Sequence, residues 1–259
     1  MKSRYLPILM IFALLVPLWT APALGQRPVV RIGIVRDGPV IHFADGLEII
    51  KDEILALTGD EFDVHFPADK MVYGDWTVTG VNQTADRLLA DPEVDLIITL
   101  GFGASHYAAQ KRDLKKPVVA AAVVDARLQG FPEQKGTSGV RNLNYISPLR
   151  DRERGIRALS ELVPFKSLAV LIDRNLAQTI PSPDDFSQAV HEIADDFSIA
   201  MNLIMVDTTA ETALEALPAE TDAVYVFPLI RLDSKEFQKL VGGLIRRQLP
   251  FPGLPAELP

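Results

Sequence analysis

The chain has 259 residues, of which 48% are hydrophobic and 23% are charged, enough apolar material for one or two globular domains. Its formal net charge of −8 at pH 7 argues against nucleic-acid binding, which requires a basic face. The sequence contains no cysteine, so the protein forms no disulfide and lacks the residue to which bacterial lipoproteins attach their lipid.

The first 25 residues are typical of a secretory signal peptide. Lys2 and Arg4 provide a positive start, residues 6–19 an apolar region, and the small residues around Ala23 a cleavage site. The apolar region is short for a membrane span, which favours cleavage over an uncleaved anchor. Without Lys2 and Arg4, 24 basic residues remain against 34 acidic ones, a net charge of about −10. The sequence therefore predicts an acidic protein exported to the periplasm.

Strands and helices are predicted to alternate in the first half of the remaining chain. Apolar runs indicate strands, and apolar residues at helical spacing indicate helices. Strands are expected at residues 30–35, 62–66, 94–100 and 117–124, and helices at residues 43–57, 81–90 and 104–111. Residues 67–79 and 127–145 lack either pattern and are expected to be irregular, the latter as a connection to a second body.

The second half continues the alternation without a residue-level repeat. Helices are expected at residues 150–162, 182–197, 209–217 and 234–247, and strands at 167–172, 201–206 and 223–227, with residues 249–251 suited to a further strand. Alternation of this kind is typical of βαβ units with a parallel sheet. The sequence therefore predicts two α/β lobes of similar size.

One stretch has the features of a ligand-facing turn. Residues 94–100 form an apolar run, expected to be a strand buried on both faces, and Gly101 and Gly103 follow it before a helix begins. In open α/β sheets, ligands bind beyond the carboxyl ends of such strands. The first N–H groups of the next helix have no partner within that helix, so they are available to a ligand.

Several short motifs, taken in order, resemble one family of two-lobed proteins. They are Asp95-Leu-Ile-Ile-Thr-Leu-Gly101, Lys116-Pro-Val-Val-Ala-Ala-Ala-Val-Val-Asp125, Gly136-Thr-Ser-Gly-Val-Arg-Asn142, Leu168-Ala-Val-Leu-Ile-Asp173 and Asp222-Ala-Val-Tyr-Val-Phe-Pro228. Behind a secretory signal, this order resembles the periplasmic substrate-binding proteins of ABC transporters, in the branch that includes receptors for tryptophan and other amino acids. The resemblance spans about residues 30–250 and rests on the ordered set, since no single motif is highly specific.

The resemblance implies a class I periplasmic binding protein, with two Rossmann-like lobes of parallel sheets flanked by helices. It places the first lobe and its crossover at residues 28–145 and the second lobe at residues 146–248, after a signal peptide at residues 1–25. The family pattern continues beyond residues 249–251 and crosses back to the first lobe, so residues 249–259 are expected to be a truncated return segment. The implied protein is a monomer without cofactor, metal or catalysis, whose partners are a small solute and an ABC permease in the inner membrane.

Carried onto this chain, the family's site lies where strand ends face the cleft between the lobes. The implied ligand contacts are Arg36, Asp37, Gly38, Gly101, Phe102, Gly103, Ala104, Ser105 and Asp125 in the first lobe, and Asp173, Arg174, Asn175 and Pro228 in the second.

Ordinary structural roles compete with these assignments. Ser105 either helps to bind a carboxylate at a helix N-terminus or caps its own helix. Phe102 either stacks on a ligand or packs within the first lobe. Residues 173–175 either pair with the charged groups of a solute or form a solvated turn. Tyr73 and Trp76 either overhang the cleft or form an exposed rim or core plug.

Other kinds of site find less support. The histidines show no metal-ligand spacing, and no Gly-x-Ser-x-Gly elbow is present. The turn at Gly101 and Gly103 is not Gly-x-Gly-x-x-Gly, because His106 stands at the last position. The alternative function is a periplasmic accessory or sensory protein attached to a signalling or export system. An α/β enzyme has only the fold in its favour.

Overall fold

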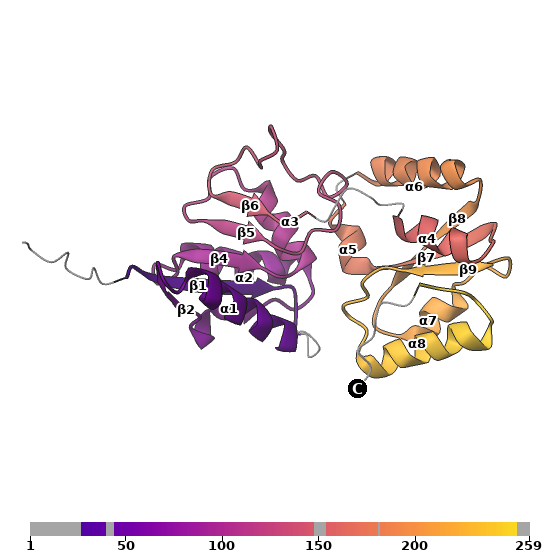
Figure 1. The fold of residues 1–259 in the computed structure, drawn as a ribbon, viewed down its shortest axis with the longest axis horizontal. Coiled ribbons are helices and arrows are strands. Elements are labelled where there is room, and N and C mark those ends of the chain that lie inside the picture. Colours follow the sequence, from indigo (N-terminus) through magenta and orange to yellow (C-terminus); the bar gives the residue numbers. More distant parts are fainter. Residues whose placement is uncertain (1–26, 40–43, 148–153, 181, 253–259) are drawn as a thin grey trace, which may run out of the picture.

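The computed structural model describes residues 27–39, 44–147, 154–180 and 182–252. It contains two parallel β-sheets, each covered by helices, which form two lobes side by side (Figure 1). We call the part that holds β1–β6 the first lobe and the part that holds β7–β9 the second lobe. The expected signal peptide at residues 1–25 lies outside the described residues.

The first lobe is built on a parallel sheet whose central strands are the most apolar runs. The strand order is β2-β1-β4-β5-β6, and β3 pairs with the later part of β1. Ile34 of β1 pairs with Ile98 of β4, which in turn pairs with Val119 of β5. The strands are β1 (Val29–Arg36), β2 (Asp63–His65), β3 (Met71–Tyr73), β4 (Leu96–Thr99), β5 (Val118–Ala120) and β6 (Leu143–Tyr145).

Helices cover both faces of this sheet, which is why its central strands are largely apolar. On one face, Leu88 of α2 and Ala108 of α3 share a buried cluster with Ile97. On the other, Leu47 of α1 packs against the cluster that contains Ile34. The helices of this lobe are α1 (Ala44–Thr58), the 3₁₀ turn η1 (Ala68–Lys70), α2 (Val78–Ala90) and α3 (Phe102–Gln110).

The second lobe has a three-stranded parallel sheet of order β8-β7-β9. All seven residues of the central strand β7 are buried. The elements are α4 (Arg154–Leu162), β7 (Ser167–Asp173), α5 (Arg174–Gln178), α6 (Pro183–Phe197), β8 (Ala200–Val206), α7 (Ala210–Glu215), β9 (Ala223–Val226) and α8 (Ser234–Arg246).

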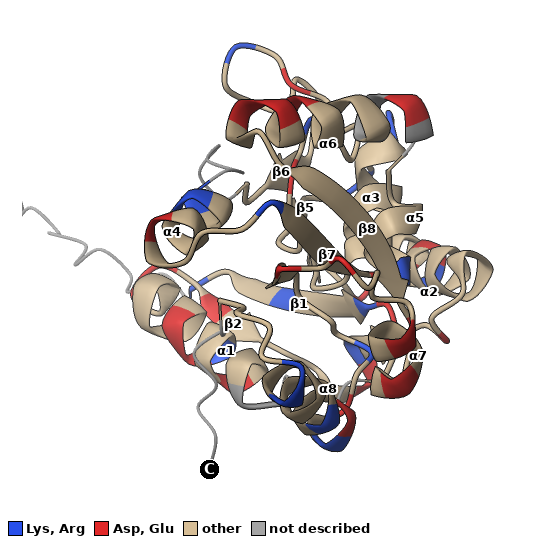
Figure 2. Ribbon diagram, turned by 90° about the vertical axis from the view of Figure 1, so that its right-hand side faces the viewer, with Lys and Arg blue, Asp and Glu red and all other residues tan. Residues whose placement is uncertain are grey.

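Alternate residues of β7 point to opposite faces and fill two separate cores. Leu171 belongs to the cluster formed with α7 and α8, which includes Leu240. Leu168 and Val170 belong to the cluster formed with α4 and α6, which includes Ile156. Figure 2, which looks onto the second lobe, shows α6 and α4 on one side of the sheet and α7 and α8 on the other.

The predicted two-lobed α/β fold is confirmed, and the differences concern short elements. Strands β3 and β6 and helix α5 form where irregular chain or a turn was expected. Each is only three to five residues long, too short to show a period in the sequence. Residues 249–251 form no strand, although Pro250 accepts a 2.9 Å hydrogen bond from the Val224 N–H beside them. Within the described part of the chain, no helix is long and apolar enough to cross a bilayer.

Replacing Leu168 with alanine tests the core of the second lobe. Leu168 is fully buried in β7, so Leu168→Ala should lower the free energy of unfolding by about 2–5 kcal/mol in urea titrations. Leu162→Ala is the matched control, because that leucine is 81% exposed and its loss should cost less than about 0.5 kcal/mol. Equal losses for the two variants would contradict this assignment of the core.

Candidate functional site

The two lobes touch where α3 meets α5 (Figure 1). Phe102, the first residue of α3, is 8% exposed and packs against Ile172 and Leu176 of the second lobe. The sequence offered ligand stacking or packing within the first lobe for this ring. In the structure Phe102 joins the two lobes instead.

The Asp37 carboxylate occupies the helix N-terminus that the sequence offered to a ligand. Asp37 follows β1 and is 2% exposed. One of its oxygens accepts the N–H of Gly103 and the other that of Ala104, each at 2.8 Å. A carboxylate there satisfies two N–H groups that lack helix partners and is favoured by the helix dipole. These two N–H groups are therefore taken by the protein itself.

This arrangement requires glycine at position 101. A Cβ on Gly101 would lie 2.1 Å from Oδ1 of Asp37 and 2.7 Å from its backbone nitrogen. The backbone of Gly101 has an ordinary extended conformation, so the requirement is purely steric. The glycine that suggested close approach to a ligand is explained by close approach to Asp37.

Ser105 is turned away from the space between the lobes. Its hydroxyl is fully buried, 2.8 Å from the Thr99 hydroxyl, and donates to the Thr99 carbonyl at 3.3 Å. It therefore holds α3 against β4. It neither faces a ligand nor caps its own helix, which differs from both roles considered from the sequence.

In the second lobe, residues 173–175 begin a helix rather than a solvated turn. Asp173 is fully buried, accepts the N–H of Asn175 at 2.8 Å and pairs with Arg231 at 3.1 Å. Arg174 pairs with Asp207 through 2.9 and 3.0 Å hydrogen bonds from Nε. Arg231 also reaches Asp207 at 3.0 Å, so these four side chains form one internal network.

Asp37 and Asp173 are two buried carboxylates near the lobe junction, close enough for the charge of one to act on the other. Burial raises the pKa of Asp37, and the negative charge of Asp173 raises it further, against the lowering effect of the α3 N–H groups. Burial also raises the pKa of Asp173, which the Arg231 guanidinium opposes. Asp37 has no ion pair among the described residues, so its negative charge depends on backbone dipoles alone.

Between the described residues, two hydrogen bonds cross directly from one lobe to the other. Asn175 donates from its side chain to the Trp76 carbonyl at 3.3 Å. Gln129, which is 1% exposed, donates to the Thr179 hydroxyl at 2.9 Å. Its amide oxygen also accepts the N–H of Val124 at 2.8 Å, which orders the chain that leaves β5. These bonds hold the lobes close together.

Trp76 shapes the first-lobe side of this junction. Its φ of 68° is uncommon for a residue other than glycine, and its backbone N–H donates to the backbone carbonyl of Asp37 at 3.0 Å. The indole lies over Gly38, where a Cβ would be 2.1 Å from the ring. Of the roles considered from the sequence for this loop, the structure packs Trp76 onto Gly38 and places it in the lining of the cavity described next.

A cavity of about 280 Å³, which we call the interlobe cavity, lies beside this contact. Residues of α2 and α3 form its first-lobe wall, and residues of α5 form its second-lobe wall. Its polar lining includes Asp37, Asn82, His106, Gln110, Asn175 and Gln178, and its aromatic lining Trp76 and Tyr107. The side-chain amides of Asn82 and Gln178 have no hydrogen-bond partner among the described residues, which leaves them available to a solute.

His106 contributes a neutral ring to the interlobe cavity. Its Nδ1 lies 3.0 Å from the Gln129 carbonyl, an acceptor, so Nδ1 carries the proton. Burial lowers the pKa of His106 below its usual value near 6.5. At neutral pH the ring therefore offers Nε2 as an acceptor.

The expected ligand contacts are thus only partly gathered around this cavity. Asp37, Gly103 and Asn175 line it. Arg36 instead lies over the Tyr73 ring, at 5.5 Å from its centroid, and Pro228 lies beyond the end of β9, outside the cavity lining. Asp125 lines a different, apolar cavity and accepts the N–H of Leu128 at 2.8 Å.

Several residues of the interlobe cavity were not expected from the sequence. Asn82, His106 and Gln110 lie within helices, one turn or more from a strand end, and Gln178 belongs to the unexpected α5. The spacing of His106 and Gln110, which puts both on one side of α3, was the available signal. It became informative only once α5 was known to face it.

No model of a known protein family matches this chain. A search of curated protein sequences also finds no significant match. Solved structures share its fold at low sequence identity. An ABC domain from Streptococcus pneumonia in complex with L-Trp has a TM-score of 0.65 and 16% identity, over 86% of this chain and 72% of that one. A periplasmic binding protein type 1 from Bordetella pertussis Tohama I has a TM-score of 0.54 and 15% identity, over 87% and 62%.

A third structure is the solute-binding protein of an ABC transporter from Rhodopseudomonas palustris BisB5, in complex with 3,4-dihydroxybenzoic acid. Its TM-score is 0.53 at 13% identity, over 85% of this chain and 59% of that one. The chain therefore has the fold of the type I periplasmic binding proteins, as the resemblance implied.

The pH dependence of stability tests the buried charge of Asp37. Because its pKa is raised in the folded state, the folded protein binds more protons than the unfolded chain above pH 3.8, and stability is lost as the pH rises through the folded pKa. An asparagine side chain cannot titrate, so the free energy of unfolding of Asp37→Asn should rise relative to that of wild type as the pH increases from 3.8 through the folded pKa of Asp37.

Urea titrations at each pH give this comparison. Asp75→Asn is the control of opposite sign, because hydrogen bonds from Thr77 lower the pKa of Asp75. The free energy of unfolding of wild type should therefore rise relative to that of Asp75→Asn as the pH increases to 3.8. A constant difference between wild type and Asp37→Asn would show that Asp37 is charged at no cost.

Proposed function

We propose that this protein is a non-catalytic, periplasmic solute-binding protein that takes up a small polar solute in the interlobe cavity. The observation that carries the proposal is a cavity with unpaired amides whose walls come from both lobes. A ligand that contacts both walls favours the closed arrangement, which is how a two-lobed receptor couples binding to closure.

The lining favours a neutral or zwitterionic solute with an apolar or aromatic portion. Amide groups from Asn82 and Gln178 donate and accept hydrogen bonds, and Trp76 and Tyr107 offer aromatic surface. An amino acid has this combination of groups. L-Trp in the complex of the Streptococcus structure is one such solute and is therefore the first to test.

Delivery to an ABC permease in the inner membrane is the role we infer for the bound form. The similarity to solute-binding proteins of such transporters supports it. A sensory or accessory role attached to a signalling or export system uses the same cavity and is the second candidate. A pull-down from a membrane extract distinguishes the two roles. Capture of a permease by the solute-loaded protein, but not by the solute-free protein, supports delivery to a transporter.

A thermal-shift screen of amino acids, small aromatic acids and related polar solutes tests the binding role. A solute that binds the folded state alone raises the melting temperature by mass action, increasingly with concentration. A screen in which none of these compounds raises the melting temperature, or in which a compound is converted to product, would overturn the proposal.

Variants of the lining locate the solute once one is found. Asn82→Ala should weaken binding about 2- to 10-fold, the cost of about 0.5–1.5 kcal/mol for one neutral hydrogen bond. Gln188→Ala on the exposed side of α6, where the amide contacts Glu192, should leave the dissociation constant unchanged. Calorimetric titration measures both, and equal affinities would place the solute elsewhere.

A further inference from the structure

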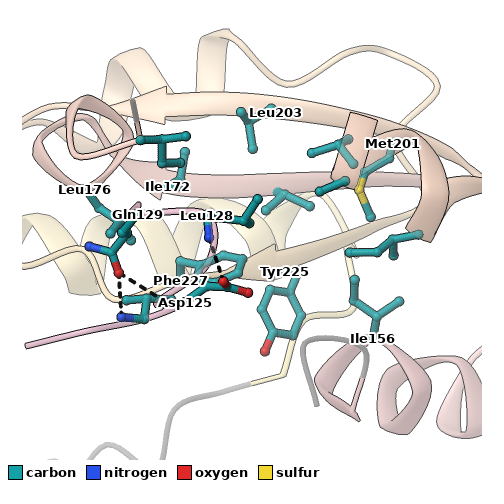
Figure 3. A pocket seen from close by; sticks show the side chains of 16 residues that line it. Asp125, Leu128, Gln129, Ile156, Ile172, Leu176, Met201, Leu203, Tyr225 and Phe227 are labelled. Carbon is teal, nitrogen blue, oxygen red and sulfur yellow. Dashed lines mark hydrogen bonds between the residues drawn. The ribbon is translucent and has the colours of Figure 1, made fainter. Parts of the chain in front are cut away.

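A second cavity, of about 290 Å³, lies between the sheet of the second lobe and its helices α4 and α6 (Figure 3). We call it the apolar chamber. Val170, Ile172, Met201 and Leu203 of β7 and β8 form its floor, and the chain that leaves β5 of the first lobe covers one end with Leu128. It is therefore walled by both lobes but set inside the second.

The chamber shares no lining residue with the interlobe cavity. The segment at α5 separates the two spaces. Leu176 and Ile180, four residues apart, line the chamber, whereas Asn175 and Thr179 line the interlobe cavity. One short segment thus presents an apolar side to one space and a polar side to the other.

The walls of the chamber are almost entirely apolar. Thirteen of its sixteen lining residues are aliphatic, methionine or phenylalanine, and the others are Asp125, Gln129 and Tyr225. Figure 3 shows Gln129 and Asp125 at one end of the chamber, each joined to backbone by hydrogen bonds. The Gln129 amide is already bonded through both its oxygen and its nitrogen. The Tyr225 hydroxyl has no hydrogen-bond partner among the described residues, so a ligand here needs at most one polar group.

Size sets the class of ligand. Protein interiors are normally close-packed, and the few apolar voids that persist stay dry and take up apolar molecules. A cavity of about 150 Å³ lined by leucine, isoleucine and phenylalanine is known to bind benzene. The chamber has about twice that volume, enough for two fused rings or a branched hydrocarbon of similar size.

We propose that the apolar chamber is a second binding site, specific for small uncharged aromatic molecules of about two fused rings. Anionic ligands are disfavoured because the described residues that line the chamber include the acidic Asp125 and no lysine or arginine. Since Leu128 of the first lobe covers the chamber, occupancy also favours the arrangement in which the lobes touch.

Methionine methyl groups report on this site. Met201 lines the chamber, Met205 lies further along β8 beside Arg174, and Met71 packs in the first lobe. With the full chain labelled at the methionine methyl carbons, naphthalene or indole should shift the Met201 resonance saturably and leave those of Met71 and Met205 in place. Intermolecular NOEs from the ligand ring to the Met201 methyl should appear in the unmodified chain.

Filling the chamber provides the matched variant. Ala189 on α6 is buried in its wall, so Ala189→Phe should abolish the Met201 shift while the variant stays folded by circular dichroism. If that variant does not fold, the smaller Ala189→Leu replaces it and should weaken the Met201 shift. The NOEs in the unmodified chain then show whether the ligand lies in the chamber. Asn82→Ala, in the interlobe cavity, should leave naphthalene binding unchanged.

Three results overturn the proposal: no Met201 shift up to the solubility limit of naphthalene, equal shifts at Met71, Met201 and Met205, or a shift that survives in a folded Ala189→Phe variant. A response to indole that Asn82→Ala removes would assign indole to the interlobe cavity, and only the naphthalene result would then count for the chamber.

Discussion

The carboxylate of Asp37 at the start of α3 is the interaction on which the arrangement of the lobes depends. It joins the end of β1 to the helix that follows β4, across the parallel pairing of these two strands. Because α3 is fixed there, Phe102 projects into the second lobe and His106 and Tyr107 face α5. The first-lobe wall of the space between the lobes is thus positioned by a helix cap made within that lobe.

The second lobe uses the same chemistry in a different way. Asp173, at the end of its first strand, caps the helix that follows immediately and also holds Arg231. Asp37 caps a helix that comes more than sixty residues later and has backbone donors only. Each lobe therefore has a buried acid at a strand end near the junction, one compensated by a guanidinium and one by a helix dipole.

The sequence was sufficient for the fold, and it predicted some residues of the candidate site but not their contacts. Long apolar runs such as residues 94–100 indicated buried parallel strands correctly, and Gly101 correctly marked a close approach. What approaches is Asp37, and nothing in local sequence shows that a residue more than sixty positions earlier supplies the cap. The polar lining of the interlobe cavity was missed because it lies on helix sides rather than strand ends, and because α5 is too short to have a period.

The place of β1 in the first sheet has a kinetic consequence. This strand, the first after the expected signal peptide, pairs with β2, β3 and β4, all of which are synthesised after it. The last of these partners is β4, whose Leu96 lies opposite Ile32. The sheet is completed only when β6 joins β5. Such a distribution of long-range parallel contacts delays folding, because loops must close before strands can pair. For the export proposed above, such a delay is an advantage, since an exported chain has to remain unfolded until it has crossed the membrane.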